Sequence, residues 1–281
     1  MKAHRTWGFR VPEQLKHALA RLKTAGFCWQ RIQPLDGGLG NRLWRLQGAG
    51  DWVLRLHNPE LAFCVDREQE QRAWRACAER GLAPSLCHWE PDFSVSQYAG
   101  SSPSQPQVQA LLALMLALHQ LPGQWNPVDP VVRIRQYLET PSEALRHYWP
   151  QLPQLAAQLA LSKLPDGFCH HDLHCGNLLI DSKGQWRVID FEYAGWGSPL
   201  MDLAPWLDGT DPGLTSPLWR EYLIQRGLSP DQQEWTAMRA AMALYGLLGA
   251  AWSERMDRCH SDRIYSQWRK HYLEQVRVWL P

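Results

Sequence analysis

The first hundred residues carry short apolar runs separated by turn residues, a pattern typical of a small antiparallel sheet. One helix is expected before the sheet, because residues 12–25 start with a proline, place apolar side chains on one helical face and are followed by Gly26. A glycine-rich segment at 35–46 and a Gly-Asp pair at 50–51 have the residues of turns between strands. Strands are expected at 29–32, 52–56, 82–89 and 93–98.

Apolar positions at helical spacing cover most of the rest of the chain. Residues 66–80 form a strong helix pattern, with Asp66 as its N-cap. Further helices are expected at 107–121, 129–139, 151–162, 199–208, 215–227, 231–256 and 262–279. A stretch rich in Ser, Pro and Gln at 101–107 marks a boundary. The pattern predicts an α+β chain, with a small antiparallel sheet in residues 1–99 and a mainly helical part in residues 100–281.

Composition narrows the class of protein. The 281 residues hold 29 basic and 28 acidic side chains, so the formal net charge of +1 gives no indication of a nucleic-acid partner. The longest apolar run, residues 110–118, is too short to cross a bilayer core of about 30 Å. Residues 1–5 are not followed by the apolar region of a signal peptide, so none is expected. Seven cysteines without a Cys-x-x-Cys pair indicate reduced thiols. We expect a cytoplasmic protein with no membrane insertion.

Residues 170–192 carry the main candidate chemistry. Asp172 is followed five residues later by Asn177, and Asp190 comes at the end of an apolar run. Two short apolar runs around a Ser-Lys-Gly turn predict a loop, a strand, a turn and a second strand. Phosphoryl transfer from ATP needs one carboxylate to orient or deprotonate the accepting hydroxyl, and an amide oxygen with a second carboxylate to hold Mg²⁺ against the phosphates. The segment provides all three groups.

This segment resembles the catalytic segment of the aminoglycoside phosphotransferase and choline kinase superfamily, a branch of the protein-kinase-like fold. That family carries H-x-D-x-x-x-x-N followed by I-D-[FW]-E, and the matching residues here are His170, Asp172, Asn177 and Ile189–Glu192. The resemblance implies a two-lobed fold with an N-lobe of residues 1–99 and a C-lobe of residues 100–281. It also implies that Asp172 is the catalytic base and that Asn177 and Asp190 bind magnesium. Asp202 would tie the following helix to the catalytic loop.

The nucleotide is expected to bind the glycine-rich turn of the N-lobe. Gly37, Gly38 and Gly40 let the backbone approach a phosphate closely and present N–H groups to it. Together with Asn41 they resemble the nucleotide loop of choline kinases, which tends to contain G-G-x-[TS]-N. Gly40 departs from the hydroxyl residue of that pattern, which removes one side-chain contact to phosphate and keeps the backbone contacts.

Three more residues are candidates for the ATP site. Arg55 lies in the strand where protein kinases have a phosphate-binding Lys, and its permanently charged guanidinium suits phosphate oxygens. Glu70 is the candidate acid that orients Arg55, with Glu68 as the alternative. By the resemblance, Tyr98–Gly100 falls where the family's hinge holds adenine.

The acceptor is expected to be a small cation with a hydroxyl group. Residues 192–195 resemble thiamine kinases and choline kinases, whose substrates are both cations that bear a primary hydroxyl. Glu192, which is also placed to reach the metal, and the aromatic Trp196 are the first candidates to bind it, with Trp206 and Asp208 next. Thiamine is the preferred acceptor, then choline or ethanolamine, then an amino sugar or aminoglycoside. No Ala-Pro-Glu segment follows Asp190, so neither a protein substrate nor an obligate protein partner is expected.

Other interpretations of residues 170–192 stay open. His170, His171 and His174 have spacings that would allow a transition-metal site and a hydrolase. A second alternative is that the segment is a purely structural hairpin whose acidic residues have no catalytic role. A nucleotide-binding regulator without catalysis is a third alternative, although the three polar groups of the motif are intact.

Overall fold

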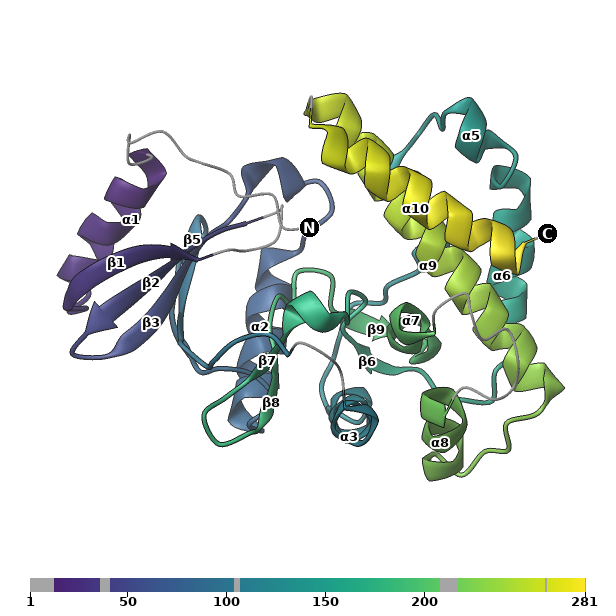
Figure 1. Cartoon of the computed structure of the whole chain (residues 1–281), viewed down its shortest axis with the longest axis horizontal. Helices are drawn as coiled ribbons and strands as arrows, with labels where there is room; N and C mark the ends of the chain where they lie inside the picture. The colour runs from purple at the N-terminus through teal and green to yellow at the C-terminus, as the bar shows by residue number, and fades with distance from the viewer. Residues whose placement is uncertain (1–12, 36–40, 104–106, 208–216, 261, 281) are drawn as a thin grey trace. The chain divides into compact units, whose positions relative to one another are not determined.

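The computed structural model describes residues 13–35, 41–103, 107–207, 217–260 and 262–280 (Figure 1). Contacts divide the described residues into two compact units. Unit 1 comprises those of Met1–Ala62 and Pro84–Tyr98, and unit 2 comprises those of Phe63–Ala83 and Ala99–Pro281. The predicted boundary after residue 99 puts 63–83 in the N-lobe, whereas contacts group this segment with unit 2.

Unit 1 is a helix on a five-stranded antiparallel sheet. The strand order is β1-β2-β3-β5-β4, and every neighbouring pair is antiparallel. The elements are α1 (Glu13–Thr24), β1 (Trp29–Leu35), β2 (Arg42–Gly48), β3 (Asp51–Leu56), η1 (Pro59–Leu61), β4 (Leu86–Trp89) and β5 (Phe93–Gln97). The expected helix and the small antiparallel sheet are confirmed, but the turn expected over 35–46 is too long, because β2 begins at Arg42.

Apolar packing forms the core of unit 1. The buried face of α1 presents Leu15, Ala18 and Leu22. These side chains share one cluster with buried residues of three strands, which are Leu46, Leu54, Leu56, Phe93 and Val95. Since α1 repeats its apolar residues every three or four positions, the whole buried face meets the sheet.

Unit 2 is mainly helical. Its helices are α2 (Arg67–Glu79), α3 (Val108–His119), α4 (Pro130–Tyr137), α5 (Glu143–Arg146), α6 (Leu152–Leu159), α7 (Leu200–Leu203), α8 (Pro217–Gln225), α9 (Gln232–Cys259) and α10 (Arg263–Trp279), with 3-10 turns η2 (Trp149–Gln151), η3 (Cys175–Asn177) and η4 (Ala204–Trp206). The long helix α9 packs against α10, α6 and α4. Small residues such as Ala240, Ala241 and Ala250 are buried along it and allow this close approach.

Two short pairs of antiparallel strands lie in unit 2 alongside its helices. The strands are β6 (Gly167–Cys169), β7 (Leu178–Ile180), β8 (Trp186–Val188) and β9 (Gly195–Gly197). β7 pairs with β8 and β6 pairs with β9, both antiparallel. The predicted loop, strand, turn and strand of the 170–192 segment are confirmed, with the turn closed by Asp181 and a left-handed Gly184.

The helix expected at 199–208 is wrong in extent. The α-helix α7 covers only Leu200–Leu203 and is followed by the 3-10 turn η4. Pro205 lies in that turn and has no backbone N–H to continue the helical ladder, so the α-helix ends before it. Residue 208 lies outside the described residues.

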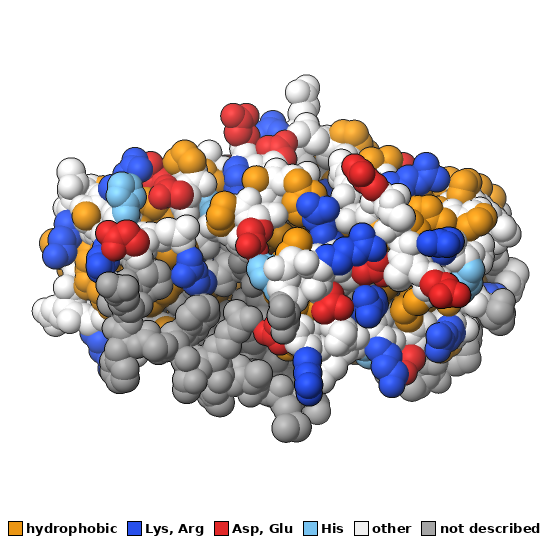
Figure 2. All heavy atoms as spheres, turned by 90° about the horizontal axis from the view of Figure 1, so that it is seen from above, with side chains coloured by type: hydrophobic (Ala, Val, Ile, Leu, Met, Phe, Trp, Pro, Cys, Tyr) orange, Lys and Arg blue, Asp and Glu red, His pale blue; other side chains and the backbone are white. Residues whose placement is uncertain are grey.

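Three further features of the described residues concern surface charge, membrane-spanning potential and the cysteines. On the face drawn in Figure 2, basic and acidic side chains are interspersed. None of the helices in the described ranges combines the length and apolar character needed to cross a bilayer. All seven cysteines are free thiols.

Candidate active site

The 170–177 loop, which follows β6, is fixed at its start by one carboxylate. The backbone N–H groups of His170 and His171 donate to Oδ2 and Oδ1 of Asp202, each at 2.7 Å. The ring of His170 bonds through Nε2 to the carbonyl of Ile189 at 2.9 Å, which ties the loop to the end of β8. Asp202 on α7 therefore holds the beginning of the loop, as the sequence predicted.

Asp202 is completely buried and belongs to a polar network. Nε2 of His119 lies 3.1 Å from Oδ2 of Asp202, and Nδ1 of His119 lies 2.7 Å from the hydroxyl of Tyr222. Burial by itself would raise the pKa of Asp202, but the hydrogen bond and charge of His119 outweigh it and lower that pKa to about 2. His119 is a packed, hydrogen-bonded structural histidine.

Two residues in this segment have an unusual backbone. His171 and Asp190 have φ angles of 61° and 70°, in the left-handed region that side chains rarely adopt. Such a conformation costs about 1–3 kcal/mol per residue and persists only where surrounding contacts enforce it. For His171 the bond to Asp202 supplies part of that constraint. Burial lowers the pKa of His171 to about 3, so its ring is neutral at pH 7.

Asp172 is the one acid of the 170–177 loop and is held by Asn177. The amide nitrogen of Asn177 donates to both the backbone carbonyl and Oδ2 of Asp172, each at 2.9 Å. The Asp172 side chain is 33% exposed, so a small molecule can reach it. Nε2 of His174 lies 3.6 Å from Oδ2 of Asp172. Burial disfavours the charged ring, but the Asp172 and Asp190 carboxylates outweigh it and raise the pKa of His174.

Three carboxylates gather at the end of β8. One oxygen each from Glu70, Asp190 and Glu192 lies within 4.8 Å of the others. The backbone N–H of Ile189 donates to the carbonyl of Asn177 at 3.0 Å, which fixes Asn177 beside the residue that precedes Asp190. We call Glu70, Asp190 and Glu192 the carboxylate cluster. Their hard oxygen atoms suit Mg²⁺. The role of Asn177 as a metal ligand stays a prediction.

Helix α2 is anchored to the segment that carries Glu192. Gln69 donates from Nε2 to the carbonyl of Ala194 at 2.8 Å and accepts the backbone N–H of Asn126 at 2.6 Å. Asp66 caps the helix, as predicted, because its Oδ1 accepts the N–H groups of Glu68 and Gln69. These contacts set where Glu70 lies in unit 2.

Arg67 was missed by the sequence reasoning. Its Nη1 lies 2.5 Å from Oε2 of Glu70 and 3.6 Å from Oε2 of Glu192. Glu70, the predicted partner of Arg55, thus contacts Arg67, three residues earlier on the same helix. That spacing was the available signal. Arg55 belongs to unit 1, and its pairing with Glu70 stays a prediction.

The histidine interpretation of this loop is not supported by the ring contacts. His170 bonds to Ile189, and His171 is half-buried with its pKa lowered to about 3, so its ring is neutral at pH 7. Two groups of three His, Cys or acidic side chains in the described part of the chain are close enough to share an ion, and neither contains a histidine of the loop. The second group, His119, Cys169 and Asp202, is fully buried, and its His and Asp bond to each other.

The predicted nucleotide residues of unit 1 are partly described. Gly37, Gly38 and Gly40 lie outside the described residues. Asn41 is buried, and its Oδ1 accepts the backbone N–H of Asn58 at 3.1 Å, so it fixes the chain that follows the glycine segment.

Arg55 lies on β3, and Tyr98 directly follows β5, where its N–H donates to the carbonyl of Asp51 at the start of β3. Arg55 is buried on β3, opposite Leu43 of β2 and Ser94 of β5. The ring of Tyr98 packs under the guanidinium of Arg45, with the Cζ atom 3.5 Å from the ring centroid. The role of both residues toward a nucleotide stays a prediction.

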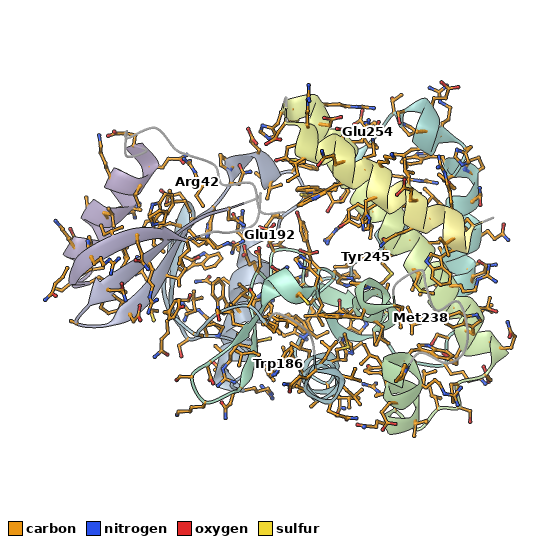
Figure 3. All side chains as sticks on the ribbon, viewed as in Figure 1. Arg42, Trp186, Glu192, Met238, Tyr245 and Glu254 are labelled. Carbon is orange, nitrogen blue, oxygen red and sulfur yellow. The ribbon has the colours of Figure 1, made fainter. Side chains whose placement is uncertain are left out.

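Four tyrosines lie near enough to Asp172 for its charge to act on their phenols, and the sequence pattern indicated none of them. Burial is the main cause that raises the pKa of each phenol, and the nearby Asp172 carboxylate raises it further. They come from α4, the turn after β8, α9 and α10, and are Tyr137, Tyr193, Tyr245 and Tyr272. Figure 3 labels Tyr245 on α9 and Glu192. Their wide separation in sequence left no local signal.

Trp196, one of the residues predicted to bind the acceptor, lies in β9. It pairs with Phe168 of β6 and is 40% exposed. Its backbone bonds to Asn126 and Val128 on the other side of the strand. Contact with an acceptor stays a prediction.

Comparison with known sequences gives one family for most of the chain. The sequence model of the phosphotransferase enzyme family matches residues 31–241. Ethanolamine kinase 2 of Rattus norvegicus is 30% identical over 198 residues, which cover 62% of this chain and 51% of that protein. The chain thus spans about half the length of the curated ethanolamine kinases it matches. Thiamine kinase of Escherichia coli O9:H4 (strain HS) is 26% identical over 258 residues, which cover 87% of this chain and 91% of that protein.

The fold has solved relatives. The choline/ethanolamine kinase family protein from Mesorhizobium loti superposes with a TM-score of 0.71 at 22% identity, over 95% of each chain. This likeness shows a protein-kinase-like fold with a five-stranded antiparallel sheet and a mostly helical C-terminal part. The fold class predicted from the sequence is confirmed.

Proposed function

Because this chain belongs to the phosphotransferase enzyme family, whose members are small-molecule kinases, we propose that it transfers the γ-phosphoryl group of ATP to an alcohol hydroxyl of a small cation, with thiamine as the first candidate. The observation that carries the proposal is the accessible Asp172 carboxylate, held by Asn177 and close to the carboxylate cluster through the Asn177–Ile189 bond. Ethanolamine is the second candidate, favoured by the 30% identity to ethanolamine kinase 2.

Asp172 is the proposed general base. Two hydrogen bonds from the Asn177 amide fix the loop and one oxygen of the carboxylate, so the side chain meets the acceptor in one orientation. The acceptor hydroxyl donates to this carboxylate, its oxygen attacks the γ-phosphorus, and the bond to ADP breaks. The hydroxyl proton passes to Asp172. Most of the rate enhancement then comes from orientation and charge stabilisation.

The carboxylate cluster fits magnesium, since it offers hard oxygen atoms from Glu70, Asp190 and Glu192 that are close together. Asp190 and Asn177 are the ligands implied by the family motif, and Glu192 and Glu70 extend that set. When bound, magnesium neutralises the phosphate charge of the nucleotide.

Unit 1 is the proposed nucleotide unit. Gly37, Gly38 and Gly40 would present backbone N–H groups to the phosphates, with Asn41 fixing the chain after them. Arg55 would bind phosphate oxygens through its guanidinium, oriented by Glu70, and the segment at Tyr98 would hold adenine.

The acceptor site is proposed to lie among the four tyrosines, with Glu192 and Trp196 as further contacts. A cation gains from the faces of aromatic rings and from nearby carboxylates, and both are close to Asp172. Thiamine is preferred to ethanolamine because the thiamine kinase relative is matched over 91% of its own length, against 51% for ethanolamine kinase 2.

The test is ADP formation with magnesium and ATP across a panel of thiamine, ethanolamine, choline, an amino sugar and an aminoglycoside. We expect thiamine to give the largest stimulation, with Asp172→Asn as the matched inactive control. Stronger stimulation by ethanolamine or choline would move the assignment to that acceptor. ATP binding without stimulation by any member would support the alternative of a nucleotide-binding regulator.

A further inference from the structure

Arg67 lies between two members of the carboxylate cluster. Its Nη1 contacts Glu70 at 2.5 Å and Glu192 at 3.6 Å. Its other terminal nitrogen, Nη2, is buried and has no hydrogen-bond partner among the residues that the structure describes. An ordinary surface pair between residues three apart on a helix has neither a second acid nor a buried spare donor, so this arrangement needs a separate explanation.

The three carboxylates of the cluster are stabilised by nearby positive charge. Three carboxylates with oxygen atoms within 4.8 Å repel one another strongly when all are ionised. The guanidinium of Arg67 is permanently charged and offsets one of them. A bound divalent cation would offset more of the negative charge, so Arg67 and a metal would act on the same three acids.

We propose that Arg67 is a positioning residue that serves as the built-in cation of the carboxylate cluster. It holds Glu70 and Glu192 beside Asp190 before a metal arrives and lowers the repulsion among the three carboxylates. This rests on the proposed function, because that function assigns the cluster to magnesium. Nothing in the sequence motif assigns Arg67 a role at this site.

Arg67→Met tests the proposal without nucleotide or acceptor, because Met retains much of the side-chain length and removes the charge. Melting temperatures are measured for the metal-free protein and with saturating magnesium chloride, with potassium chloride at equal ionic strength as the reference. In the variant the unbalanced acids repel until the metal binds. We therefore expect a lower metal-free melting temperature and a rise on adding magnesium that clearly exceeds the rise in the wild-type protein.

Three variants make the result specific. Arg75→Met removes an exposed arginine from the same helix and should respond to magnesium like the wild-type protein. Arg67→Lys keeps the charge and should restore most of the wild-type response. The double variant R67M/E192Q removes one positive and one negative charge and should recover metal-free stability relative to Arg67→Met.

The outcomes separate this inference from the function on which it rests. A magnesium response in Arg67→Met equal to that of the wild-type protein would overturn the role of Arg67 and leave the kinase assignment intact. If Arg67→Met does not fold, the same comparison is made with Arg67→Lys and R67M/E192Q, and a double variant less stable than Arg67→Lys in both conditions would also overturn it. Absence of any magnesium response in the wild-type protein would overturn both the inference and the metal assignment of the cluster.

Discussion

The sheet of unit 1 and the 170–177 loop of unit 2 are stabilised in different ways. The sheet depends on apolar side chains of α1 packed against three strands, a pattern that repeats along the sequence. The loop depends on single polar contacts: two backbone N–H groups on Asp202, an amide on Asp172 and a ring on Ile189. Regular packing therefore builds the scaffold, and individually placed hydrogen bonds with a strained backbone build the site.

This contrast has consequences for mutation. A lost methyl group in the sheet core costs stability in proportion to its size and leaves the site intact. A lost partner in the loop leaves buried donors without acceptors and releases a backbone that is held in an unfavourable conformation. Mutations in the sheet core should therefore lower stability alone, whereas mutations in the loop should lower both stability and turnover.

The largest effect is expected for Asp202→Ala. The N–H groups of His170 and His171 and the ring of His119 would lose their acceptor, so the free energy of unfolding should fall by about 3–5 kcal/mol. Turnover at a temperature where the variant is still folded should fall with it, because the loop is released. Chemical denaturation and steady-state kinetics measure both. Wild-type turnover in the folded variant would contradict the positioning role.

Leu22→Ala in unit 1 should lower stability without lowering turnover. Leu22 is fully buried, so the free energy of unfolding should drop by about 2–4 kcal/mol. Turnover of the folded protein should stay within about twofold of wild type, since the change lies in α1 and leaves every contact of the loop in place. Leu22→Met, which keeps most of the volume, should cost under about 1.5 kcal/mol. A turnover loss as large as that of Asp202→Ala would erase the difference between the regions.

A smaller effect is expected from acid. The pKa of Asp202 is lowered to about 2 in the folded protein, against about 3.9 in an unfolded chain. The stability it provides is complete above about pH 5 and is lost as the pH falls through about 2, a total of about 2–3 kcal/mol. Denaturation curves between pH 6 and 2 measure it. The loss should be weaker in Asp202→Ala than in Leu22→Ala, and equal slopes in the two variants would contradict it.

Much of the fold followed from local pattern. The cap at Asp66, the helix α1 and the turn at Asp181–Gly184 each depend on residues close together in the chain. The helix predicted at 199–208 is longer than the observed α7 because the apolar pattern continues past Pro205, whose missing N–H ends the α-helix.

The site was predicted in part. The spacing of Asp172, Asn177 and Asp190 gave the loop and its polar groups. The partner of Glu70 and the tyrosines around Asp172 could not be found in the same way. They converge from segments far apart in the chain, and a single sequence contains no record of which distant side chains meet.

The central claim is that Asp172 carries phosphoryl transfer. The most direct test compares wild type and Asp172→Asn for ATP affinity by calorimetry and for turnover with the acceptor that stimulates wild type most. We predict unchanged ATP affinity and melting temperature with at least about a hundredfold loss of turnover, the usual scale for loss of a general base. Turnover near the wild-type value in a correctly folded variant would contradict the account.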